Sequence, residues 1–189
     1  MVLSRRYVSA SVLALAAVGA AGPWLAPAAH ADDRDRLAGD GIAALHRLED
    51  TDSRARGLAR KAKAVLVFPS ILKAGFVFGG ETGNGVLLKG NKPDSFYNLS
   101  GGSWGLQIGG QDFSYALFFM TNESLRYLRD SAGWSAGTGP SVVVVNAGAA
   151  GEADITTLTH DVYAFPFNAK GLMADLTLQG TKISRIHPT

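Results

Sequence analysis

The chain has 189 residues, of which 47% are hydrophobic and 18% charged, a composition typical of one globular domain with its own core. It contains no cysteine, which excludes disulfides, thiol catalysis, cysteine-type zinc sites and a lipid-modified N-terminal cysteine. Arg5 and Arg6 account for the formal net charge of +2, so the rest of the chain is neutral and any electrostatic binding, to nucleic acid or to a membrane, needs a local patch.

Residues 1–31 have the three parts of a cleavable signal peptide. Arg5 and Arg6 precede an apolar segment at residues 8–21, and an A-x-A site ends at Ala31, after which we expect cleavage. The apolar segment is shorter than the roughly 20 residues that span a bilayer. Pro23 also disfavours the alternative of an uncleaved anchor, because it breaks the helix where an anchor would continue.

The two arginines fit either a Sec signal or a twin-arginine signal. Either pathway predicts a periplasmic or secreted protein, peripheral to a membrane. Residues 32–189 are then expected to form a single domain, as their length suggests. No second apolar stretch of spanning length follows, so this domain should be soluble or peripheral.

Three helices are expected in chain order. Apolar residues at helical spacing predict a first helix from about Asp40, and the polar cluster at residues 50–53 predicts a turn and an N-cap. A second helix should occupy residues 53–63. A third should open at residues 121–125 and end before Gly133.

The remaining segments predict strands. Residues 64–68 form a short apolar strand that Pro69 should end, and residues 82–85, with Asn-Gly, indicate a tight turn. The glycine pairs at 79–80, 101–102 and 109–110 suggest bulges or bends. Further strands are expected at these segments: 75–78, 85–88, 95–99, 104–108, 113–120, 141–146, 162–167, 172–178 and 182–186. The predicted fold is α+β, with N-terminal helices packed on a strongly curled antiparallel sheet or partial barrel.

The second helix is amphipathic and basic. Its apolar arc holds Ala55, Leu58, Ala59 and Ala62, and between residues 51 and 63 the local charge is +4. One interpretation is a helix that lies on an anionic lipid surface. The other is a helix that docks its apolar face on the sheet and leaves its cations in solvent. The cations that flank the arc are Arg54, Arg56, Arg60, Lys61 and Lys63.

Motifs for catalysis are weak. Residues 101–105 match G-x-S-x-G around Ser103, and Asp154 and His160 follow in the order of an α/β-hydrolase, but three glycines within residues 104–110 oppose the helix that this motif requires. No histidine pair has metal-ligand spacing, and the glycine-rich loops match no phosphate-binding pattern. We expect no enzymatic activity, metal or cofactor, with a serine hydrolase as a minor alternative.

The sequence resembles the SYLF domain family. The motifs are KAVLVFP at residues 63–69, KAGFVFGG at 73–80, SGGSWGLQIG at 100–109, FFMT at 118–121 and GLMA at 171–174, followed by GTKI at 180–183. They cover most of residues 40–187 in order.

The resemblance implies lipid binding. Family members contact phosphoinositides through a basic helix near the N-terminus, and some fungal members bind actin; exported bacterial relatives are regarded as envelope lipid-binding proteins. The resemblance therefore implies headgroup contacts from the helix at residues 53–63 and from Lys73. Phe76 and Trp104 are candidate apolar contacts, although core positions are the simpler expectation for both. An export signal makes actin and phosphoinositide implausible ligands, so phospholipid is the expected partner. The alternative is a module that binds an envelope protein.

Overall fold

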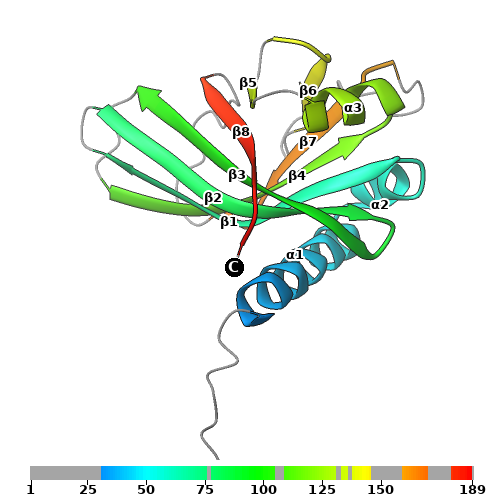
Figure 1. The fold of residues 1–189 in the computed structure, drawn as a ribbon, viewed down its shortest axis with the longest axis horizontal. Helices are drawn as coiled ribbons and strands as arrows, with labels where there is room; N and C mark the ends of the chain where they lie inside the picture. Colours follow the sequence, from blue (N-terminus) through cyan, green and yellow to red (C-terminus); the bar gives the residue numbers. More distant parts are fainter. Residues whose placement is uncertain are drawn as a thin grey trace, which may run out of the picture.

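The computed structural model describes residues 31–75, 78–104, 109–130, 133–135, 138–145, 159–169 and 180–188. Within these ranges it contains helices and strands in an α+β arrangement, as predicted (Figure 1). The helices are α1 (Ala31–Thr51), α2 (Ser53–Ala59) and α3 (Asn122–Asp130). The strands are β1 (Ala64–Gly75), β2 (Phe78–Lys89), β3 (Lys92–Trp104), β4 (Gly109–Phe119), β5 (Trp134–Ser135), β6 (Val142–Val144), β7 (Val162–Phe167) and β8 (Thr181–Ile186).

The strands form one strongly curled sheet in the order β5-β8-β3-β2-β1-β4-β7-β6. Every pairing is antiparallel except that between β6 and β7, which is parallel, so the sheet is mixed rather than purely antiparallel. The four long strands β1 to β4 extend beyond the helices at one end (Figure 1). The predicted half-barrel with N-terminal helices is confirmed.

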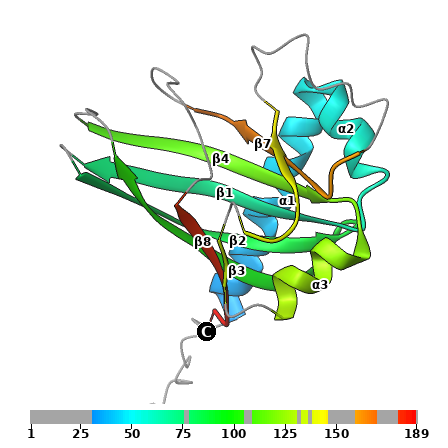
Figure 2. The same ribbon diagram turned by 90° about the horizontal axis from the view of Figure 1, so that it is seen from above.

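Both faces of the sheet are buried near the helices. Along β1, Val65 and Val67 pack under α1 and α2, whereas Leu66 and Phe68 pack inside the curl, which α3 helps to cover. Viewed from above, α1 and α3 lie on opposite sides of the sheet (Figure 2). Burial on two faces explains why residues 64–68 are continuously apolar instead of alternating.

Helix α1 is longer than predicted, because it runs through Gly39 and Gly41 and begins at Ala31 instead of near Asp40. Gly41 is required by packing, since a Cβ there would overlap the Cγ1 atom of Val86 in β2. Gly39 faces open space. The two glycines lowered the helix propensity of this segment, and the contact of α1 with the sheet compensates for it.

A bulge in β1 overturns two predictions. Pro69 does not end the strand, because the register against β2 and β4 shifts between Val67 and Leu72 and the strand then continues to Gly75. Gly83 and Gly85 are not in a turn but in mid-strand in β2, opposite this bulge. A Cβ at either glycine would come within 2.6 Å of a backbone oxygen of β1, which only glycine avoids.

The observed turn between β2 and β3 lies at residues 90–91, where Gly90 has a φ of 59°. The glycine pairs at 79–80 and 101–102 stay in register, so the bulges expected there are absent from the described β2–β3 ladder. Gly109 and Gly110 likewise pair regularly with β1. The glycines instead gather at the far end of the four long strands.

The other expected elements agree in part with the structure. The third helix is present as α3, the strand at 162–167 is β7, and the strand at 182–186 is β8, which begins one residue earlier. The strand at 141–146 is shortened to β6. The strand at 172–178 and residues 1–30 of the expected signal peptide lie outside the described residues. None of the described helices is long and apolar enough to cross a membrane.

Candidate functional site

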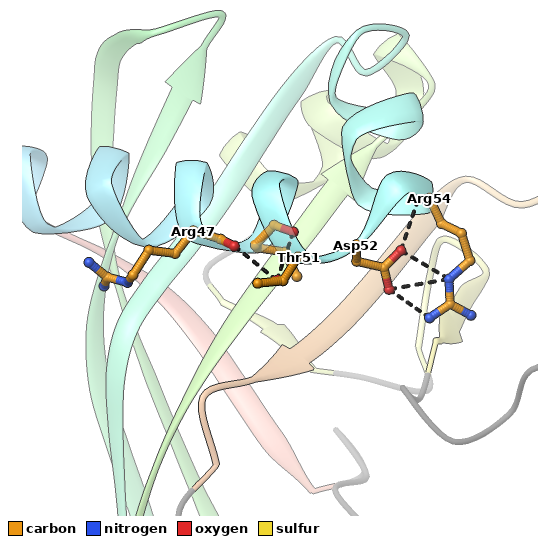
Figure 3. A network of polar contacts seen from close by, with 5 residues as sticks. Arg47, Thr51, Asp52 and Arg54 are labelled. Atoms are coloured by element: carbon orange, nitrogen blue, oxygen red, sulfur yellow. Dashed lines mark hydrogen bonds and ion pairs between the residues drawn. The ribbon is translucent and has the colours of Figure 1, made fainter.

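The basic segment begins at a tight junction between two helices. At the last residue of α1, the Thr51 hydroxyl donates to the carbonyls of Arg47 (2.9 Å) and Leu48 (3.2 Å) (Figure 3). Asp52 is extended and accepts a hydrogen bond from the Arg54 backbone N–H at 2.8 Å, which makes it the N-cap of α2. A single residue therefore separates the two helices. The N-cap predicted within residues 50–53 is Asp52, whereas residues 50 and 51 still belong to α1.

Helix α2 ends at Ala59, four residues earlier than predicted, with Arg60 as its C-cap. The residues that follow, 60–63, form a turn into β1. The side chains of Ala55 and Leu58 are 0% exposed and belong to the core beneath α1. The docked interpretation of this helix is therefore correct, and its apolar face is not available for insertion into a bilayer in this conformation.

Arg54 is partly engaged within the protein. Its Nη2 and Nε atoms donate to the Asp52 carboxylate at 2.6 and 3.1 Å, and its guanidinium lies 5.9 Å from the centre of the Phe165 ring (Figure 3). The hydrogen bond from Arg54 lowers the pKa of Asp52, although burial opposes this effect. The same bond raises the pKa of Arg54. Of the predicted headgroup contacts on α2, Arg54 is thus the least available.

The other cations of this segment are exposed. They gather on α2 and on the turn that follows it, and within the described part of the chain none of them forms an ion pair. They are Arg56, Arg60, Lys61 and Lys63, and we call them the basic patch. The Lys63 backbone N–H donates to the Phe119 carbonyl at 2.8 Å, so the patch is attached directly to the end of the central β1–β4 pair.

Lys73 does not join the basic patch. It lies beyond the bulge on β1, about 30 Å from Ala64 at the usual rise per strand residue, and pairs across the strands with Glu81. Burial raises the pKa of Glu81, and the Lys73 charge partly offsets this. Lys73 therefore faces a buried carboxyl at the other end of the sheet.

The predicted apolar contacts are placed only in part. Phe76 lies outside the described residues, and Trp104 is the last residue of β3, where its backbone pairs with Phe78. Ser103 also lies within β3, opposite Gly79, and not at the strand-to-helix turn that a nucleophile elbow requires. Asp154 lies outside the described residues.

Possible metal ligands are scattered in the structure as well. His160 stacks edge-on against Tyr163 at 5.9 Å, while His46 is on α1 and His187 follows β8. The described residues contain no group of three or more His, Cys, Asp or Glu side chains placed to hold a metal ion.

A polar cluster next to the basic patch was missed by the sequence interpretation. The Asp161 carboxylate accepts hydrogen bonds from the Ser141 backbone N–H (3.1 Å), the Ser141 hydroxyl (3.0 Å) and the Thr121 hydroxyl (3.3 Å). These bonds lower the pKa of Asp161, with the Ser141 backbone contributing most. The Asp161 carbonyl also accepts from the Met120 N–H at 2.9 Å. The cluster fixes the end of β4. No local motif indicates it, because its members are 20 to 40 residues apart in the sequence.

Comparison with known proteins supports the resemblance given by the motifs. Residues 100–187, just under half of the chain, match the sequence model of the family Ysc84, described as "Las17-binding protein actin regulator". The match runs from β3 through β8 and does not include α2. No curated protein matches the chain. That family is one of binding domains, and residues 100–187 of this chain are similar to it, in agreement with the resemblance to SYLF domains.

Proposed function

We propose that this protein is an exported lipid-binding protein that contacts phospholipid headgroups through the basic patch. The observation that carries the proposal is the exposure of Arg56, Arg60, Lys61 and Lys63 at one end of the molecule, without ion pairs to other described residues. Outside the leader the chain is formally neutral, so this concentration of charge stands out against the rest of the surface.

The buried face of α2 determines the expected mode of binding. Because Leu58 and Ala55 pack in the core, the helix offers cations but no apolar surface to the lipid. Binding would then be electrostatic and peripheral, with long side chains that reach headgroup phosphates. Each Lys or Arg near an anionic surface contributes about 1 kcal/mol, and this contribution falls within a Debye length of about 8 Å at physiological salt.

Charge reversal of the patch tests the proposal. In R56E/R60E/K63E three favourable charges are lost, about 3 kcal/mol or more than a hundredfold in affinity, before any repulsion is counted. Cosedimentation of the purified chain with vesicles that contain anionic phospholipid measures this loss. The matched control is K92E/R126E/R185E, which changes the net charge equally at exposed cations elsewhere. Equal binding by the two variants would contradict the site.

A second candidate function is an interaction module for an envelope protein. The family description names binding to a protein, Las17, and actin regulation, but an exported chain would not meet cytoplasmic actin. This alternative predicts that the purified chain ignores vesicles of any composition. It also predicts that a pull-down from envelope extract retains a protein partner. If that partner docks on the basic patch, R56E/R60E/K63E loses it; if the partner docks elsewhere, the variant keeps it.

A further inference from the structure

A groove of about 530 Å³ lies at the opposite end of α1 from the basic patch. Three segments far apart in the sequence build it, and the C-terminal end of the described chain lies beside the start of α1 in both views (Figures 1 and 2). Its volume is within the range of about 300–1,000 Å³ that is typical of small-ligand sites. The lining residues of α1 are Asp33, Arg36, Leu37 and Asp40; those of the sheet and tail are Asn84, Asn98, Ile186, His187 and Pro188.

Two asparagines on neighbouring strands form part of the lining. Asn84 on β2 and Asn98 on β3 are directly paired in register. The Asn98 side-chain NH₂ group, which has two N–H donors, lies within hydrogen-bonding distance of three acceptors: the Asn84 Oδ1 atom (2.9 Å), the Gly83 carbonyl (3.2 Å) and the Thr82 hydroxyl (3.3 Å). These bonds orient both carboxamides. Among the described residues, none bonds to the Asn84 NH₂ group or to the Asn98 Oδ1 atom, so one donor and one acceptor remain for a ligand.

The charged side chains of the lining are acidic on balance. Arg36 forms an ion pair with Asp33, whereas Asp40 has no ion pair within the described part of the chain. The aspartate and arginine side chains of the lining therefore carry a formal charge of −1. These side chains would not attract a phosphate headgroup as the basic patch would.

The lining combines polar side chains with aliphatic ones. Asp40, Asn84 and Asn98 offer hydrogen-bond donors and acceptors, and Leu37 and Ile186 supply apolar surface. A sugar ring has the matching pattern, since hydroxyls that both donate and accept project from its edge and C–H groups cover its faces. We propose that this groove binds a short neutral saccharide, with its hydroxyls on Asp40, Asn84 and Asn98. The inference does not depend on the lipid proposal, because it rests on other residues.

Nuclear magnetic resonance of the ¹⁵N-labelled chain tests it, with maltotriose, cellotriose and triacetylchitotriose as probes. At millimolar concentration at least one of them should shift the side-chain amide signals of Asn84 and Asn98 and the backbone amide of Leu37. In D40N/N84A the same saccharide should bind at least tenfold more weakly. The control D50N/N91A makes the same two changes at exposed positions outside the groove and should bind like the parent.

Three outcomes would overturn the proposal: none of the saccharides shifts these signals, D40N/N84A binds as well as its control, or only spermidine, added as a cationic probe, produces the shifts. The last result would indicate an acidic surface without sugar recognition. Well-dispersed spectra of both double variants establish that each is folded, so loss of binding then reports on the groove.

Discussion

Replacement of Leu58 by alanine separates a docked α2 from one that inserts into lipid. The Leu58 side chain is 0% exposed and packs with the core between α1 and the sheet. A Leu-to-Ala change at such a site removes the buried methyl groups and leaves a cavity, at a cost of about 2–5 kcal/mol. We expect a loss near 3 kcal/mol, since α1 on one side and the sheet on the other limit how far the cavity collapses.

Urea denaturation followed by circular dichroism measures this loss. With a slope of about 1–3 kcal/mol per molar urea, the midpoint of L58A should fall by about 1–3 M. The matched control is L72A, the same substitution at a leucine that is 55% exposed, where the cost should stay below about 1 kcal/mol. Under conditions where L58A remains folded, its binding to anionic vesicles should equal that of the parent. Equal midpoints for L58A and L72A, or weaker vesicle binding by folded L58A, would refute the docked helix.

Two further substitutions probe the packing and capping of the same region. Gly41→Ala should destabilise the chain by about 1–3 kcal/mol, because the new Cβ overlaps with Val86. Gly39→Ala, on the same helix but in open space, should stabilise the chain by up to about 1 kcal/mol. Equal changes in the thermal unfolding midpoint for the two variants would contradict the packing of α1. Asp52→Ala should cost about 1 kcal/mol at neutral pH through loss of the N-cap and of the ion pair with Arg54. Because the pKa of Asp52 is lowered in the folded state, its charge stabilises the fold above the ordinary aspartate pKa of about 3.9, and this stabilisation is lost as the pH falls through the lower folded value. The free energies of unfolding of D52A and the parent should therefore converge in acid. A difference that persists or widens there would refute this assignment.

Local patterns were sufficient to predict the fold class but not the register of the strands. The apolar run at 64–68 predicted a buried strand, and β1 contains it. Asn84 and Gly85 predicted a turn because Asn-Gly tolerates positive φ, yet both residues pair in register with β3 in the middle of β2. The reason lies in β1, whose bulge brings its backbone oxygens close to Gly83 and Gly85. No window around residue 84 contains that information.

The candidate site was predictable to a similar extent. The alternation of alanine, leucine and cations in residues 53–63 identified an amphipathic basic segment, and the exposed patch agrees with it. The same pattern fits both a docked helix and a membrane helix, so only tertiary contacts of Leu58 distinguished them. The family resemblance grouped Lys73 with the basic patch. The ten residues from Ala64 to Lys73 run along one extended strand, however, so Lys73 lies far from the patch.

Helix α1 acts as a spacer between two chemically different regions. From Leu37 to Thr51 it spans about 21 Å, which is between two and three Debye lengths at physiological salt. Charge changes at one end should therefore leave affinity at the other almost unaltered, and their free energies should add. A ligand in the groove and a lipid surface at the basic patch would bind at the same time, and neither would change the affinity of the other. The protein would then link its two ligands without acting as a switch.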